Sequence, residues 1–260
     1  MGKITAEGRG LMANPKIMLI LSLLFFVSVH ASPVFAAEKN SCIECHKNLP
    51  PGTYVGHKYP DYAGSVHDRK GVRCEACHGG DPVSRDAKGA HAGMYKSGDP
   101  KSPIYYQNIP WTCGKCHERE LVNFSQSKHY LELKTSGKGP SCVTCHGSMG
   151  TFILNSAQIQ EFCAVCHNSD RGILPDKPAE VEEVLTLMEQ TDTLIRWSEE
   201  FVNTARMQGK NVAGPEEAIR HAHQEMAGAR ESWHTFKMEE VRARLKEAYN
   251  AARKAKEKIR

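Results

Sequence analysis

The 260-residue sequence is poor in aromatic side chains, which make up 7% of it, within a hydrophobic content of 40%. No stretch shows the apolar–polar alternation of a half-buried strand, which argues against a sheet. No cysteine lies outside five short motifs, so no thiol is left for a separate disulfide framework. The intervals between these motifs differ in length, which excludes a solenoid of equal repeats.

The chain does contain five copies of Cys-x-x-Cys-His, the attachment motif of c-type haem. In such a motif, two thiols form thioethers with the vinyl groups of one porphyrin edge, and the histidine supplies the proximal ligand of the iron. The cysteine pairs are Cys42 and Cys45, Cys74 and Cys77, Cys113 and Cys116, Cys142 and Cys145, and Cys163 and Cys166. The proximal histidines are His46, His78, His117, His146 and His167. The sequence therefore predicts five covalently attached haem c groups.

Other uses of paired cysteines fit this pattern less well. Zinc sites would combine such motifs in twos, and five is an odd number. A thioredoxin-type pair would occur once, beside a βαβ pattern, and disulfides would not require a histidine after every second cysteine. The pattern therefore favours haem over zinc, iron–sulfur clusters and disulfides.

Each haem iron also has a second axial position, and seven histidines remain outside the motifs and the N-terminal leader. His67 and His129 each follow a serine by two residues and lie upstream of a motif, where we expect the chain to cross a neighbouring porphyrin. His57 and His91 lie in glycine-bounded loops, which allow the backbone to approach closely. We predict these four residues as distal ligands.

The fifth distal ligand is expected from the C-terminal helices. His234 lies at a break between two helices, where a side chain can turn inward, and is our candidate. His223 is the reserve because it shares a helix face with Ile219 and Met226, whereas His221 points to the far side. Histidine on both sides of the iron gives lower potentials than histidine with methionine.

Residues 1–36 are predicted to be a secretory signal peptide. Basic residues precede an apolar run over 17–29, and the sequence up to Ala36 fits a cleavage site. The alternative is an uncleaved membrane anchor, although the run is shorter than the roughly 20 residues that a span needs. We therefore expect a periplasmic or secreted protein with no stable membrane span after cleavage.

The mature chain changes in composition near residue 176. Residues 37–176 hold all five motifs, joined by turns rich in glycine and proline, and we expect a haem domain that is largely unfolded without haem. Residues 177–260 lack cysteine and have apolar residues at helical spacing, which predicts a helical hairpin or three-helix bundle packing on the haem domain. The predicted fold class is mainly α, with short helices and loops wrapped around five haems.

The formal net charge of +4 does not indicate a nucleic-acid binder. Five haems would add about ten propionate charges and about five positive charges on oxidised iron, so we expect the loaded protein to be acidic. The basic residues of 241–260 are expected on a solvated helix end, or alternatively in a docking site for an acidic partner.

Two patterns carry a resemblance to known proteins. Residues 65–67 (Ser-Val-His) lead to the motif at 74–78, and residues 127–129 (Ser-Lys-His) lead to the motif at 142–146. Together with His234 between two helices, they resemble multihaem c-type cytochromes. More narrowly, they resemble the superfamily of hydroxylamine oxidoreductase, its tetrahaem acceptor cytochrome, octahaem tetrathionate reductase and pentahaem nitrite reductase. The resemblance implies stacked haem pairs, helical wrapping and work outside the cytoplasm.

The chain departs from the nitrite reductases of that group. Those enzymes commonly carry a lysine in place of one motif histidine, whereas all five motifs here end in histidine, and the chain is much shorter. We therefore expect an electron carrier with no catalytic residues, passing electrons through mostly bis-histidine haems in anaerobic respiration. Its partner would be a quinol dehydrogenase, a reductase or another cytochrome, and an oligomer is compatible with the sequence.

Two alternatives remain open. The first is a reductase of a small nitrogen or sulfur oxyanion, of the nitrite, hydroxylamine or tetrathionate type, with one open iron position. Its candidate pocket residues are His91, Lys101, Tyr105, Tyr106 and Arg119. The second is a subunit of a larger cytochrome complex or filament.

Overall fold

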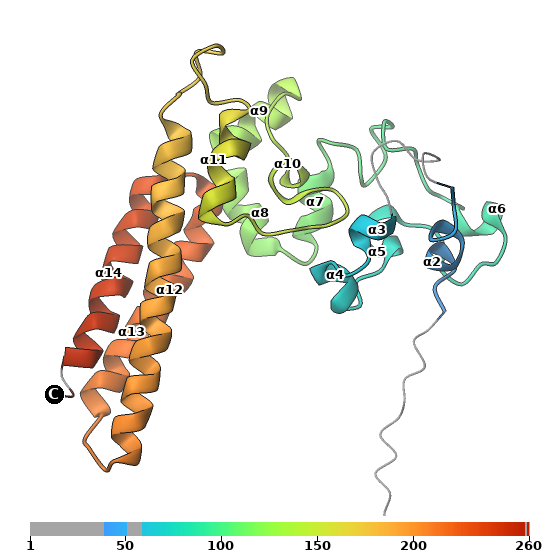
Figure 1. The fold of residues 1–260 in the computed structure, drawn as a ribbon. Coiled ribbons are helices and arrows are strands. Elements are labelled where there is room, and N and C mark those ends of the chain that lie inside the picture. The colour runs from blue at the N-terminus through green and yellow to red at the C-terminus, as the bar shows by residue number, and fades with distance from the viewer. Residues whose placement is uncertain (1–38, 51–58, 258, 260) are drawn as a thin grey trace, which may run out of the picture. The chain divides into compact units, whose positions relative to one another are not determined.

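The computed structural model describes residues 39–50, 59–257 and 259, and the chain from Asn40 onward forms one compact unit. Every regular element in this part of the chain is a helix (Figure 1), which confirms the predicted mainly α fold class. Short helices come first and three long helices follow. No helix among the described residues is both long and apolar enough to cross a membrane.

The short helices occupy the part of the chain that carries the motifs. They are α2 (Ser41–His46), α3 (Tyr59–Tyr62), α4 (Val66–Arg69), α5 (Cys74–His78), α6 (Ala87–Ala90), α7 (Ile109–Gly114), α8 (Glu118–Ser125), α9 (Lys128–Ser136), α10 (Cys142–His146) and α11 (Ser156–Ala164). Helices this short are marginal on their own. The side chains of Asn40, Ser65, Asp86, Ser127 and Asn155 cap five of them by accepting a backbone N–H in the first turn. Such a cap contributes about 1 kcal/mol.

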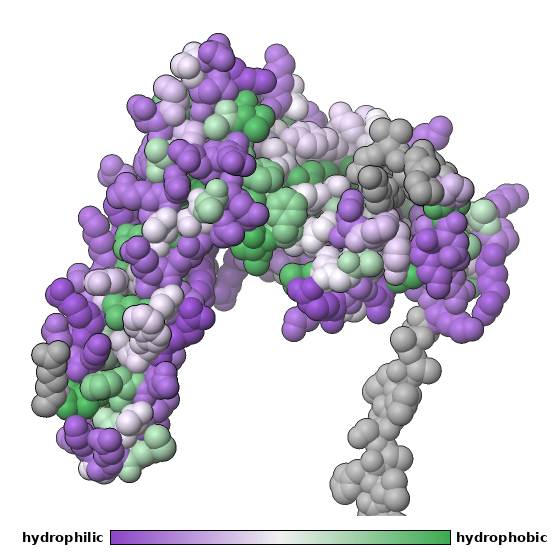
Figure 2. Space-filling model, viewed as in Figure 1, coloured by the Kyte–Doolittle hydropathy of each residue, from purple (hydrophilic) through white to green (hydrophobic). Residues whose placement is uncertain are grey.

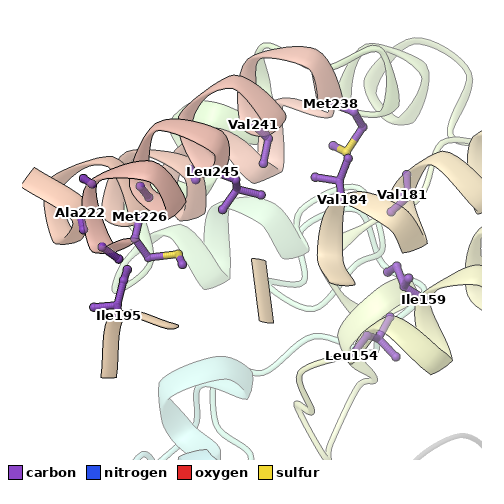
Figure 3. Close-up of a cluster of buried hydrophobic side chains, with 14 residues drawn as sticks. Leu154, Ile159, Val181, Val184, Ile195, Ala222, Met226, Met238, Val241 and Leu245 are labelled. Atoms are coloured by element: carbon purple, nitrogen blue, oxygen red, sulfur yellow. The ribbon is translucent and has the colours of Figure 1, made fainter. Parts of the chain in front are cut away.

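The three long helices are α12 (Lys177–Met207), α13 (Ala213–Ser232) and α14 (Met238–Glu257), with the 3₁₀ turn η1 (Trp233–Thr235) between the last two. They pack on one another, as the predicted three-helix bundle requires (Figure 1). The apolar residues at helical spacing meet in the core (Figure 3). The buried seam consists of Val181, Val184, Ile195 and Val202 on α12, Ile219, Ala222, Met226 and Ala229 on α13, and Met238, Val241, Leu245, Ala248 and Ala252 on α14.

The part with the short helices has little core of its own. Among the described residues before Leu154, the buried leucine and aromatic side chains are Tyr62, Phe124 and Leu133. Leu154 and Ile159, which lie before and in α11, already belong to the core of the bundle. Helix α11 thus joins the motif-bearing part to α12, and α8 contacts η1.

Candidate haem sites

The five motifs occupy helix ends. Helices α2, α5 and α10 each end on the motif histidine, while the third and fifth motifs run through the last residues of α7 and α11 into a turn. Residues three apart lie on one face of a helical turn, so both cysteines of a motif can reach one porphyrin edge. The sequence had predicted short helices at the motifs, and the structure has them.

Four motif histidines lie against a histidine from another segment. The distances between ring centroids are 6.0 Å for His46 and His91, 6.1 Å for His117 and His67, 6.2 Å for His146 and His234, and 5.9 Å for His167 and His129. The second histidines of these pairs come from α4, α9, η1 and the end of α6.

These spacings fit one metal ion between each pair of rings. A metal–imidazole bond is about 2.0–2.1 Å long and the ring centre lies about 1.1 Å behind the nitrogen, so two imidazoles on opposite sides of one ion lie about 6.3 Å apart. Rings in direct stacking contact lie closer, often near 4.5 Å. The residues present therefore fit iron with two axial histidines at four sites.

Hydrogen bonds select the nitrogen that can bind the metal. The Nδ1 atoms of His91, His146 and His167 lie 2.8, 2.9 and 3.2 Å from the backbone oxygens of Ala87, Phe152 and Ile173, respectively. A carbonyl only accepts, so Nδ1 donates and Nε2 keeps its lone pair. Metal-bound histidines usually donate a hydrogen bond from the N–H of their other nitrogen, which fixes the ring orientation and raises the basicity of the metal-bound nitrogen.

Three of the second histidines have a lowered pKa, which favours the neutral imidazole. Burial lowers the pKa of His67, His129 and His234, and the histidine opposite each of them lowers it further. A neutral imidazole has a free lone pair, which iron requires. These positions are therefore prepared for a metal rather than for a proton.

Local capping places two of these histidines. Ser65 caps α4 and Ser127 caps α9, so His67 and His129 each stand in the first turn of a helix whose start is fixed. Gly139 lies against the same turn as His129, since a Cβ there would come 2.4 Å from the His129 oxygen. The Ser-x-His pattern read from the sequence thus corresponds to a helix N-terminus.

The remaining histidines fall outside this scheme. His57 lies outside the described residues. The side chain of His223 is 51% exposed and lies 2.6 Å from the Glu199 carboxylate, and that of His221 lies 3.1 Å from Glu247. The expectation that His223 shares the buried face of Ile219 and Met226 is wrong, because the core seam of α13 runs through Ala222 instead.

The motifs are neighbours in space in the order of the sequence. Burial and the nearby thiol of Cys42 raise the pKa of Cys74 to about 11. The first and second motifs therefore lie close together. The thiol of Cys77 lies close to Cys113, and the thiol of Cys113 in turn lies close to Cys142.

The last link in this order joins the fourth motif to the fifth. Burial raises the pKa of Cys145 to about 11, with Cys163 and Cys166 nearby. The cysteine pairs of successive motifs thus lie beside one another, so the motifs form a continuous row.

Apolar side chains are exposed around the motifs. Trp111 is 55% exposed two residues before Cys113, and Val165, inside the fifth motif, is 65% exposed. Phe152 and Phe162 pack ring to ring at 5.9 Å, yet both remain about two-fifths exposed. Apolar surface is visible among the short helices in Figure 2. Large apolar groups around a metal-binding motif are what a porphyrin would cover.

Three of the five candidate pocket residues of the reductase alternative, His91, Tyr106 and Arg119, have other contacts. His91 faces His46. The Tyr106 hydroxyl accepts the Ser141 N–H at 3.1 Å and lies 2.8 Å from the Thr144 hydroxyl, so it holds the chain at the fourth motif. Arg119 pairs with Glu231 of α13.

Sequence reasoning missed the groups that orient the histidines. The backbone oxygens of Ala87, Phe152 and Ile173 leave no residue-type signal, because any residue carries a carbonyl. Phe236, whose ring lies 4.4 Å from that of His129, was also missed. Its signal was its position two residues after His234.

One comparison with known proteins gives a match. Residues 100–171 match the family model of cytochrome c7 and related cytochrome c, and this stretch contains the third, fourth and fifth motifs. No curated protein and no solved structure matches the chain. The family match and the motifs support a multihaem electron-transfer cytochrome with covalently bound haem c.

Proposed function

We propose that this chain carries five haems and passes electrons along them outside the cytoplasmic membrane. The observation that carries the proposal is the second histidine found opposite four motif histidines, at ring spacings of 5.9–6.2 Å. When bound, haem supplies the one-electron chemistry of its iron. In this proposal histidines of the chain would occupy both axial positions of each iron, so no position would stay open for a substrate.

The distal ligands in this proposal are His91 for the first haem, His67 for the third, His234 for the fourth and His129 for the fifth. Support comes from the ring pairs with His46, His117, His146 and His167. His57 is assigned to the second haem, since the other four candidates lie against other motifs.

The row of motifs supports a path in chain order. Electrons would enter or leave at the first and fifth haems, because each intermediate motif has a neighbour on both sides. Cys74 and Cys77 illustrate this, since one lies near Cys42 and the other near Cys113. The partner is a redox protein such as a quinol dehydrogenase, a reductase or another cytochrome.

The location rests on chemistry and sequence together. Haem is attached to Cys-x-x-Cys-His motifs outside the cytoplasmic membrane, and residues 1–36 have the pattern of a signal peptide. We therefore place the protein in the periplasm or among secreted proteins. The sequence patterns at 65–78, 127–146 and 233–236 are similar to those of the hydroxylamine oxidoreductase superfamily, whose members work outside the cytoplasm.

The test is a mass spectrum and an electron paramagnetic resonance (EPR) spectrum of the purified, oxidised protein. We expect the added mass of five haems and only low-spin ferric signals. A high-spin signal that changes with nitrite or hydroxylamine would instead favour the oxyanion reductase. A mass with fewer than five haems would contradict the proposal that each of the five motifs carries a haem.

A variant tests the ligand that comes from the bundle. In His234→Ala we expect one of five haems to become high-spin, because the imidazole opposite His146 is lost. The matched control is His223→Ala, which removes an exposed histidine of the preceding helix and should leave all five haems low-spin. Five low-spin haems in His234→Ala would contradict the assignment.

A further inference from the structure

Phe236 lies at an unusual point of the backbone. It follows η1 directly and adopts the left-handed conformation, with φ 58° and ψ 22°, before α14 begins. Residues other than glycine rarely adopt this conformation, and in folded proteins they do so where surrounding contacts require it. Its own N–H is bonded to the Trp233 oxygen at 3.1 Å, so the turn is closed.

The ring of Phe236 lies against a proposed haem ligand. Its centroid is 4.4 Å from that of His129, and the two planes meet at 77°, so the edge of one ring meets the face of the other. Phe124 supports it from another side, with centroids 6.4 Å apart. The contact joins α9, α8 and the turn after η1.

His129 and His234 differ from His91, His146 and His167 in their hydrogen bonds. His91, His146 and His167 have a backbone oxygen within reach of Nδ1. The Nδ1 atoms of His129 and His234 are buried and have no hydrogen-bond partner among the described residues. The His129 imidazole has the ring of Phe236 beside it, at 77° to its own plane.

We propose that Phe236 is a positioning residue for the fifth haem: it fixes the plane of the His129 ring and keeps strong acceptors and water away from Nδ1. The inference rests on the proposed function, because it assigns His129 to an iron. It adds that the turn carrying His234 also orients the distal ligand of the neighbouring haem. The two distal ligands are thus set by one backbone segment.

The contact has a consequence for the reduction potential. A hydrogen bond from Nδ1 to a strong acceptor makes an imidazole a better electron donor and stabilises ferric iron. An aromatic face is a much weaker acceptor than a carbonyl or water. Phe236 therefore holds the fifth haem at a more positive potential than it would have with a solvated His129.

A purely structural role for the ring has to be separated from this one. Phe236 also packs against the core of the bundle, so its removal costs stability in either case. A packing role changes the unfolding temperature alone, whereas the positioning role changes the spectrum and the potential of one haem. The test therefore uses the folded, five-haem protein.

The variants are Phe236→Leu, which removes the ring and keeps an apolar side chain, and Phe236→Tyr, which keeps the ring. In Phe236→Leu we expect five low-spin haems, a changed EPR signal for one of them, and a shift of one midpoint potential to more negative values in an optical redox titration. Phe236→Tyr should restore the wild-type values. Phe201→Leu, in the bundle, is the control for an aromatic-to-leucine change.

Unchanged potentials and signals in Phe236→Leu overturn the inference, even if the protein unfolds at a lower temperature. So does a shift in Phe236→Tyr as large as that in Phe236→Leu. These outcomes differ from a failure of the proposed function. In that case the wild-type protein itself would lack five low-spin haems.

Discussion

The motif-bearing part and the bundle of the same chain hold themselves together by different means. Helices α12, α13 and α14 bury an apolar seam in which Val184, Val241 and Leu245 are fully enclosed. The short helices before α11 bury few large apolar side chains and leave others, such as Trp111, exposed. The bundle thus contains its own core, while the motif-bearing part is built around something it binds.

Burial energetics explain the contrast. Enclosing a leucine-sized side chain contributes about 1.5–3 kcal/mol, and the bundle does this repeatedly along its seam. Ordering the loops between the motifs costs about 1–2 kcal/mol of backbone entropy for each residue. Caps such as Ser65 and Ser127 supply only a fraction of that. In the proposed function, covalently attached porphyrins, with their large apolar faces, would supply the missing core.

The strongest test of this contrast is to prevent haem attachment. Without haem we expect the motif-bearing part to lose its protection against amide hydrogen exchange almost completely. The bundle should keep its helices, which span 31, 20 and 20 residues. The measurement is hydrogen exchange with mass spectrometry on the full chain, produced with and without the attachment machinery.

The control for this experiment is the loaded protein under the same conditions. If the unloaded motif-bearing part stays as protected as the loaded one, the caps and turns suffice and the contrast fails. If the bundle also loses protection, its stability depends on the docked motifs. Either result would revise the comparison.

A smaller effect is expected from weakening the bundle alone. Leu245→Ala removes a fully buried side chain from the seam, and we expect a loss of about 2–5 kcal/mol in the free energy of unfolding of the bundle. The number of haems and their low-spin signals should not change. Denaturant unfolding followed by circular dichroism, together with a haem count, measures both.

Met207→Ala is the matched control, since Met207 is 82% exposed near the end of α12. It should leave stability almost unchanged. A loss of haem in Leu245→Ala would mean that the motif-bearing part depends on the bundle core.

The sequence predicted the bundle well because its signal is local. The apolar residues at helical spacing on α13 and α14 include Ala222, Met226 and Leu245, and all three are buried in the core. At His223 the local spacing is misleading. A residue four positions after Ile219 lies at the edge of the face, and its pairing with Glu199 on another helix is not visible in one sequence.

At the histidine sites, too, local patterns could be predicted from the sequence and contacts between distant segments could not. The motifs are read directly, and the Ser-x-His pattern corresponds to capped helices α4 and α9. Which motif each histidine faces depends on the path of the loops, so the sequence could not pair His67 with His117. The role of Phe236 depends on a left-handed backbone turn, for which phenylalanine is no signal.

The smallest effect is expected at the junction of the two regions. Asn123 of α8 donates from Nδ2 to the Glu231 backbone oxygen at 2.5 Å, and so satisfies a carbonyl in the last turn of α13. Asn123→Ala should cost about 0.5–1.5 kcal/mol, the usual net value of one hydrogen bond. Arg119→Ala should cost less than about 1 kcal/mol, because an ion pair this exposed is screened by water.

Both variants leave His234 in place, three residues beyond Glu231, so five low-spin haems are expected in each. The measurement is thermal unfolding of the loaded protein, with an EPR spectrum of the same sample. A high-spin haem in Asn123→Ala would mean that the end of α13 is held by this one bond. The bundle alone would then not hold His234 in place opposite His146. The contrast between a bundle that holds itself together and a motif-bearing part that depends on haem would not apply to this ligand.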